Sequence, residues 1–267
     1  MEIYVVQPGD TLYSISTATG VSMSQLIQDN RPADPAHLAV GQTLVLQFPE
    51  QIHTVQPGET LYSIAGRYNI TPKELKQNNP ILEGQDTIWP GQTLVISFQG
   101  EKEGAFYVNG YTYPFINRTL FHSSLPYLSY LTPFTYGFSE EGELVPIEDE
   151  DLIAAAIAQQ VAPLMHLSSL TPEGIFSNEL ASLLLNNMEI QERLIDNLEV
   201  TLLEKGYVGL DVDFEFIFAR DAPYYAAFIS RLTQRFNPLG ILVIVALAPK
   251  TSADQPGLLY EGHDYQA

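Results

Sequence analysis

Two patterns of hydrophobic and polar residues follow one another along the chain, and the change falls near residue 105. Before it, short β-branched stretches and brief helical patterns occur in the order strand, helix, helix, strand, and this order occurs twice. After it, longer apolar runs alternate with stretches of helical periodicity. We therefore expect a multidomain protein, with two small α+β modules (βααβ) before a larger domain of different architecture.

The second pattern predicts parallel β/α units. Its apolar runs are typical of strands buried on both faces, and helical stretches, such as residues 178–206, separate them. The expected strands are residues 105–111, 128–138, 162–170, 207–216 and 241–249. A complete (β/α)₈ barrel needs roughly 200 residues or more. We therefore expect residues 105–267 to form an α/β barrel of the (β/α)8 type that is truncated after its fifth strand.

The two small modules are copies of one another. The segment "VVQPGDTLYSI" (5–15) returns as "TVQPGETLYSI" (54–64), and "VGQTLVL" (40–46) returns as "PGQTLVI" (90–96). A period of about 50 residues with two matching blocks indicates two units of one fold. We place these units at 2–48 and 52–98, and a polar linker at 99–104.

Three carboxylates interrupt an otherwise apolar strand, "GLDVDFEF", at residues 209–216. Asp211, Asp213 and Glu215 alternate with apolar residues, so a strand would place all three on one face, roughly 6.5 Å apart. Like charges at that range raise one another's pKa values and cost free energy. Barrel enzymes place catalytic groups at the carboxyl ends of their strands, which is where Glu215 falls. We therefore interpret the three acids as a catalytic stack.

Two other interpretations of these acids fit the sequence less well. A calcium loop also presents the pattern D-x-D, but it needs glycine at its sixth position, where this chain has Phe216. A purely structural cluster of buried acids needs a neighbouring Lys or Arg, and the strand carries neither. We expect no metal site and no cofactor.

Composition limits the partners. The net charge is −20, of which residues 101–267 carry −15, and such a surface repels nucleic acid and anionic lipid. The chain has no cysteine, so it forms no disulfide. We see no signal peptide at its start and no apolar run long enough to enter a membrane. A neutral or mixed-charge ligand is expected, without nucleic acid or membrane insertion.

The repeated blocks "QPGDTLYSI" and "VGQTL" resemble the LysM module, which binds N-acetylglucosamine-containing glycans such as peptidoglycan and chitin. The resemblance implies a shallow glycan-binding groove in each repeat. For each of these residues a purely structural role, in a turn, a helix cap or the core, stays open as the alternative. The residues that the resemblance assigns to the grooves are Gly9, Asp10, Thr11, Leu12, Gly58, Glu59, Thr60, Leu61, Asn79, Pro80 and Ile81.

The segment "GLDVDFE" resembles the D-x-D-x-E core of glycoside hydrolase family 18, and with two LysM repeats it is most similar to spore-cortex peptidoglycan hydrolases. The resemblance implies a retaining, substrate-assisted N-acetylglucosaminidase. Glu215 would be its general acid, Asp213 would orient the substrate acetamide, and Asp211 would tune Asp213. It further implies a role in sporulation or germination, at the spore coat, the cortex or the cell wall.

Several features bear on this resemblance. Tyr111, Tyr136 and Ser168 lie near expected strand ends and are candidate substrate-binding residues, whereas His166 is expected to be a satisfied barrel histidine. Val208 occupies a place where the family usually has a further Asp, and the family's sixth-strand Tyr and eighth-strand Trp have no counterpart in this chain. Two alternatives to an active enzyme therefore stay open, an inactive glycan-binding barrel and a structural protein of the spore surface.

Overall fold

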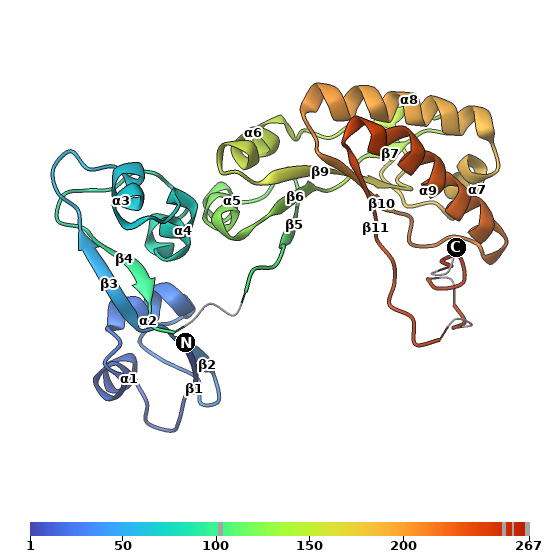
Figure 1. Ribbon diagram of the computed structural model, residues 1–267. Helices are drawn as coiled ribbons and strands as arrows, with labels where there is room; N and C mark the ends of the chain where they lie inside the picture. Colours follow the sequence, from blue (N-terminus) through green and yellow to red (C-terminus); the bar gives the residue numbers. More distant parts are fainter. Residues whose placement is uncertain (101–103, 253–254, 258, 265–267) are drawn as a thin grey trace. The chain divides into compact units, whose positions relative to one another are not determined.

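The computed structural model describes residues 1–100, 104–252, 255–257 and 259–264, and it divides into two compact units (Figure 1). The first unit comprises Met1–Phe106 and Asn117–Tyr127. The second comprises Tyr107–Ile116 and Leu128–Ala267. In the described part of the chain, no helix is long and apolar enough to cross a membrane.

The first unit contains both repeats, and each has the expected order of strand, helix, helix, strand. In each repeat the two strands pair antiparallel, and the helices bury one apolar face against them. The first repeat consists of β1 (Glu2–Val5), α1 (Leu12–Thr19), α2 (Met23–Asn30) and β2 (Thr43–Leu46). The second consists of β3 (Pro49–Thr54), α3 (Leu61–Tyr68), α4 (Pro72–Gln77), the short 3₁₀ helix η1 (Pro80–Leu82) and β4 (Thr93–Phe98).

An asparagine holds the second helix of each repeat to its last strand, and that of the second repeat, Asn79, is buried. The Asn79 amide donates to the carbonyls of Leu75 and Val95, both at 2.8 Å, and its oxygen accepts from the Val95 backbone N–H at 2.8 Å. Asn30 makes the equivalent three bonds in the first repeat, at 2.6 to 3.0 Å. Each repeat is therefore held together by the hydrogen bonds of one asparagine side chain as well as by its own hydrophobic core.

A later segment of the chain completes the first unit. Helix α5 (Arg118–Ser124) and the 3₁₀ helix η2 (Leu125–Tyr127) pack on the second repeat. The Gln77 side chain donates to the Pro126 carbonyl at 2.8 Å, and the Tyr127 hydroxyl donates to the Gln77 carbonyl at 3.2 Å. Gly84 has a φ of 75° and lies against the His122 carbonyl, so a side chain there would clash.

The second unit is built on a five-stranded parallel sheet in the order β11-β10-β9-β6-β5. All five expected strands are present, and each is shorter than its apolar run. They are β5 (Asn109–Thr112), β6 (Tyr130–Pro133), β9 (Ala162–Ser168), β10 (Gly209–Asp213) and β11 (Leu242–Val245). A small antiparallel pair, β7 (Gly137–Phe138) and β8 (Leu144–Val145), follows β6.

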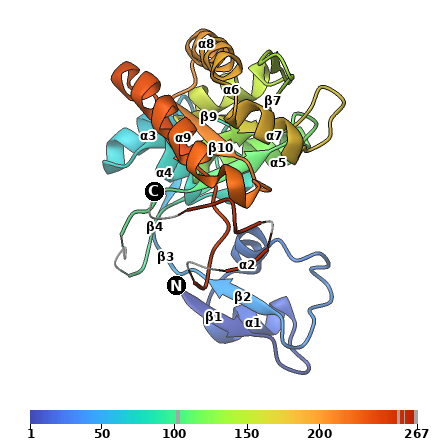
Figure 2. The same cartoon turned by 90° about the vertical axis from the view of Figure 1, so that its right-hand side faces the viewer.

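Helices cover one face of this sheet (Figures 1 and 2). They are α6 (Glu150–Ala158), α7 (Asn178–Leu185), α8 (Met188–Lys205) and α9 (Ala222–Phe236), with the 3₁₀ helices η3 (Ala219–Asp221) and η4 (Asn237–Leu239) on either side of α9. Leu210 and Val212 of β10 are fully buried in the same apolar cluster as Leu198 of α8 and Phe228 of α9. Along the described residues β11 pairs only with β10 and forms one edge of the sheet.

The expected helical stretch 178–206 is two helices. The chain leaves the first at Asn186, and Asn187 begins the second by accepting from the backbone N–H groups of Glu189 and Ile190. Asparagine prefers such N-cap positions because its side chain satisfies donors that have no partner within the helix. Gly206, with a φ of 74°, ends α8 as expected.

A buried ion pair joins the sheet of the second unit to two of its helices. Asp149, at the N-terminus of α6, is fully buried. Its carboxylate accepts hydrogen bonds from the hydroxyls of Tyr136 (2.6 Å) and Tyr207 (2.5 Å) and from the Lys205 ammonium group (2.5 Å). Burial raises the pKa of both tyrosines, and the bonds to Asp149 add to this shift.

We predict that Asp149→Asn lowers the free energy of unfolding of the second unit by about 3 kcal/mol, because it removes the buried counter-ion of Lys205 and leaves that ammonium group only the exposed Glu150 carboxylate, 2.8 Å away. Thermal unfolding followed by the near-ultraviolet circular dichroism of the tyrosines measures this. Glu148→Gln, at the exposed neighbouring residue, is the matched control and should leave the transition in place. Equal melting of both variants would contradict the prediction.

Candidate active site

The alternation along β10 sends its acids to the face of the sheet opposite the helices. Leu210 and Val212 enter the core beneath the helices, so Asp211 and Asp213 point the other way. On the neighbouring strand β9, His166 pairs with Asp211 and Ser168 pairs with Asp213. Polar side chains thus lie side by side at the carboxyl end of two parallel strands.

Asp211 is the deepest of the three acids, with 2% of its surface exposed. Tyr111, from β5, donates its hydroxyl to Asp211 Oδ2 at 2.6 Å. Burial raises the pKa of the Asp211 carboxyl, whereas the hydrogen bond from Tyr111 and the nearby His166 act in the opposite direction. Burial also raises the pKa of Tyr111, and its bond to Asp211 contributes to the shift. The Asp211 carboxyl is thus a desolvated hydrogen-bond acceptor, and the Tyr111 hydroxyl is the donor that it holds.

Asp213 lies above a chain of buried hydrogen bonds. His166 Nε2 is 3.4 Å from Asp213 Oδ2, and the same imidazole contacts the hydroxyl of Thr135 through Nδ1 at 2.6 Å. Thr135 in turn contacts Ser168 Oγ at 2.9 Å. The ring of Tyr111 packs edge-on against the His166 ring, with centroids 5.6 Å apart. Asp213 therefore lies close to a buried imidazole whose other nitrogen contacts Thr135, while Nε2 itself makes no hydrogen bond in the described residues.

A cavity of about 300 Å³ opens beside Asp213. Its other walls are Tyr111 and Thr112 of β5, Tyr113, which follows β5, and Phe134, which follows β6. Tyr113 stacks on Phe115 with ring centroids 5.0 Å apart. The cavity therefore combines one carboxylate with aromatic walls, a combination suited to a ligand that has both polar groups and an apolar face.

Glu215 lies just beyond the end of β10. Phe214 before it is fully buried in the core, whereas Glu215 is exposed. In the described residues its carboxylate makes no hydrogen bond or ion pair, so it is free to contact a ligand. The buried Phe214 side chain thus anchors the chain directly before Glu215, and Glu215 itself lies exposed at the carboxyl edge of the sheet.

Two of the residues expected to bind substrate are buried instead. Tyr136 is 1% exposed and directs its hydroxyl to Asp149, so it does not line the cavity, which is a correction to the sequence-based expectation. Ser168 has no exposed surface and contacts Thr135. Sequence reasoning missed Thr135 entirely, because its role depends on where the chain turns after β6. We expected His166 to be a barrel histidine with all its hydrogen bonds made. Its Nδ1 contacts the Thr135 hydroxyl, and its Nε2 faces Asp213.

The acidic residues of the expected LysM grooves hold their own turns. Asp10 Oδ2 accepts from the Gln7 backbone N–H and from the Tyr4 hydroxyl, both at 2.7 Å, and these bonds lower the pKa of Asp10. In the second repeat Glu59 accepts from the Gln56 backbone N–H and contacts His53, which together lower the pKa of Glu59 to about 2. Both carboxylates therefore stay ionised and keep the turn before the first helix in place.

The other expected groove residues divide between structural positions and exposed ones. Leu12 and Leu61 are buried in the repeat cores, and the Asn79 side chain is occupied by backbone groups. Gly9 and Gly58 have φ values near 90° that the turn requires. Thr11 and Thr60 cap the first helix of each repeat, Pro80 is half-buried, and Ile81 is 55% exposed.

Comparison with known proteins accounts for both units. The family model described as "LysM domain" matches residues 4–47 and again residues 53–97. The cortical fragment-lytic enzyme of Bacillus subtilis is 34% identical over 273 residues, an alignment that covers 100% of this chain and 62% of that protein. The chain carries two LysM domains and is similar along its whole length to this cortical fragment-lytic enzyme.

Solved structures agree with this relationship. The spore cortex-lytic enzyme SleL of Bacillus megaterium QM B1551 is 29% identical, with a TM-score of 0.76 over 99% of this chain and 62% of that chain. A chitinase of Chromobacterium violaceum, 19% identical with a TM-score of 0.54 over 60% of this chain and 51% of that chain, shares the fold of the second unit. This chain spans about three-fifths of the length of the cortical fragment-lytic enzyme and of SleL.

We predict that Tyr111→Phe makes stability more sensitive to pH. Because the pKa of Asp211 is raised, the folded state binds the proton of this carboxyl more tightly than the unfolded state does. The contribution of Asp211 to the free energy of unfolding is therefore favourable at low pH and is lost as pH rises through the folded-state pKa. Removing the Tyr111 hydroxyl penalises the ionised carboxylate further. The expected loss is about 2 kcal/mol at neutral pH and much less at acidic pH, where Asp211 is protonated with or without the tyrosine.

The measurement is thermal unfolding at a series of pH values for the wild type, Tyr111→Phe and Tyr113→Phe. Tyr113 lines the same cavity and is exposed, so its variant should follow the wild type at every pH. A loss in Tyr111→Phe that is the same at acidic and neutral pH would show that the bond to Asp211 is not its cause.

Proposed function

We propose that this protein is a spore-cortex peptidoglycan hydrolase that cleaves N-acetylglucosaminyl bonds. The observation that carries the proposal is the arrangement of Asp211, Asp213 and Glu215 from the buried part of β10 to its open carboxyl edge, beside an aromatic cavity. The relationship to cortex-lytic enzymes over the whole chain supports the substrate class.

The proposed mechanism uses one general acid and the substrate's own acetamide. Glu215 donates its proton to the leaving glycosidic oxygen while the carbonyl oxygen of the 2-acetamido group attacks the anomeric carbon. This displacement breaks the glycosidic bond and forms a cyclic oxazolinium. Water then attacks the same carbon, the Glu215 carboxylate takes up the proton of that water, and the product keeps the original configuration.

Asp213 supports the positive charge that forms in this reaction. Its half-buried carboxylate would accept the acetamide N–H and thereby hold the carbonyl oxygen near the anomeric carbon. His166 Nε2 lies 3.4 Å from this carboxylate and is its nearest basic neighbour in the site. Asp211 is buried and bonded to Tyr111, so its electrostatic influence on Asp213 does not vary with solvent exposure. A fixed charge costs no reorganisation during the reaction.

The two LysM domains would hold the enzyme on its substrate. Each offers a turn stabilised by an acid with a lowered pKa, and the second repeat also exposes Ile81 on η1. Two weak sites on one chain gain affinity for a polymer that presents many copies of the same unit. We therefore place the protein at the spore cortex or cell wall, bound to peptidoglycan or another N-acetylglucosamine-containing glycan.

We predict that Glu215→Gln lowers the rate of glycan cleavage by about 10²- to 10⁴-fold without loss of glycan binding, because an amide cannot deliver the proton. Asp213→Asn should also lower the rate, since it removes the charge that supports the oxazolinium. The measurement is release of reducing ends from N-acetylated cortex peptidoglycan, with product masses determined by mass spectrometry.

Glu204→Gln, at an exposed acid on α8, is the matched control and should keep the wild-type rate. If Glu215→Gln also keeps that rate, the catalytic assignment fails. Wild-type protein that binds peptidoglycan and releases no reducing ends would instead identify a glycan-binding protein.

We predict that Ile81→Ser weakens binding to insoluble peptidoglycan by about five- to tenfold, since it replaces an exposed apolar side chain at the proposed groove. Sedimentation of the full chain with washed cell-wall material measures the retained fraction. Ile52→Ser, on β3 and similarly exposed, is the control and should bind as the wild type does. Equal retention of both variants would remove Ile81 from the proposed binding surface.

A further inference from the structure

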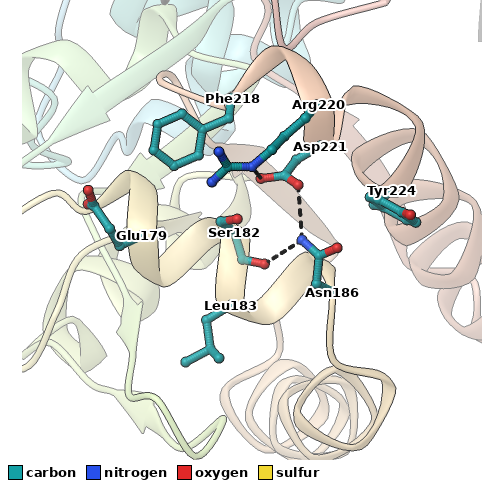
Figure 3. Close-up of a pocket in the computed structure, with 8 residues that line it drawn as sticks. All are labelled: Glu179, Ser182, Leu183, Asn186, Phe218, Arg220, Asp221 and Tyr224. Atoms are coloured by element: carbon teal, nitrogen blue, oxygen red, sulfur yellow. Dashed lines mark hydrogen bonds and ion pairs between the residues drawn. The ribbon is translucent and has the colours of Figure 1, made fainter.

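A second, larger cavity lies in the second unit and plays no part in the mechanism above (Figure 3). Its volume is about 670 Å³, and it shares no lining residue with the cavity beside Asp213. Helix α7, which follows β9, forms one side, and the segment that follows β10 forms the other. The residues that the argument uses are Asn186 from the end of α7, Phe218, Arg220 and Asp221 from the segment after β10, and Tyr224 from α9.

The floor of this cavity contains a carboxylate with spare accepting capacity. Asp221 is 1% exposed, and Asn186 donates its amide to Asp221 Oδ1 at 2.9 Å. Within the described part of the chain, Oδ2 has no hydrogen-bond partner, and Arg220 Nε lies 4.0 Å from it. A buried carboxylate oxygen without a hydrogen-bond donor costs free energy, so an O–H or N–H group that donates to Oδ2 would be stabilising.

The walls offer flat surfaces above that carboxylate. The Arg220 guanidinium stacks over the Phe218 ring at 4.4 Å from its centroid, and Tyr224, half exposed, lies on the other side of Asp221 (Figure 3). Planar groups of this kind pack against the C–H faces of a sugar ring, while amide and carboxylate groups bind its hydroxyls. Glu179, exposed at the rim, joins Asp221 in opposing a ligand with a net negative charge. Arg220 opposes one with a net positive charge.

We propose that this cavity is a second glycan-binding site of the second unit, in addition to the proposed LysM sites, and that it takes a neutral N-acetylated sugar of the polymer through hydroxyl donors to Asp221. The proposal rests on the proposed function for its choice of polymer. The segments after β9 and β10 that form the site begin where those two strands end, at the same edge of the sheet as the catalytic acids. One glycan strand bound at both cavities would dissociate more slowly than one bound at the acids alone.

The test is fluorine NMR of the chain labelled with 3-fluorotyrosine, titrated with the N-acetylglucosamine tetramer. Tyr224→Phe and Tyr111→Phe identify the two resonances that report on the two cavities separately. We expect the Tyr224 resonance to shift in a saturable manner. Arg220→Ala should weaken this response at least fivefold and leave the Tyr111 response unchanged, whereas Arg193→Ala, at an exposed arginine of α8, should change neither.

The outcomes separate this proposal from the proposed function. A Tyr224 resonance that stays in place while that of Tyr111 shifts overturns the second site and leaves the catalytic assignment intact. A Tyr224 shift without a Tyr111 shift supports the second site and counts against the catalytic assignment. An equal Tyr224 response in Arg220→Ala and Arg193→Ala also overturns the second site, because the sugar would then not contact the stacked guanidinium.

Discussion

The burial of Asp211 beneath the open edge of the sheet is the constraint on which the candidate active site depends. A carboxylate removed from water is unfavourable unless donors reach it, and here the donor comes from Tyr111, a hundred residues earlier in the chain. That bond can form only if β5, β6, β9 and β10 lie in order and in register. The site is therefore assembled by the whole sheet rather than by the β10 segment that supplies its acids.

The hydrophobic partners of the acids are as important as the acids. Leu210, Val212 and Phe214 are fully buried in the core under α8 and α9. A one-residue shift of β10 would bring the carboxylates into that core and these apolar side chains out of it, at a large cost in free energy. The apolar face thus sets the register, and the register places Asp213 beside His166 and leaves Glu215 exposed.

The sequence was sufficient where a local period or an internal repeat carried the information. The repeated blocks predicted two copies of one small unit, and the apolar runs predicted all five parallel strands. It was insufficient where the answer lay in contacts distant along the chain. Tyr136 turns away from the cavity because Asp149, Lys205 and Tyr207 meet it in the core, and no local pattern encodes that meeting. Thr135 could have been noticed only as a polar residue within an apolar run.

The two cavities of the second unit share one chemical property despite their different walls. Each lies near a buried carboxylate with one oxygen that has no donor in the described residues, Asp211 Oδ1 near the first and Asp221 Oδ2 in the second. The basic side chains near these oxygens, His166 and Arg220, make other contacts, with Thr135 and with the Phe218 ring. In the second cavity, whose lining includes Asp221, a neutral ligand rich in hydroxyl and amide donors can satisfy that carboxylate. The acidity of this unit is thus compatible with a neutral glycan.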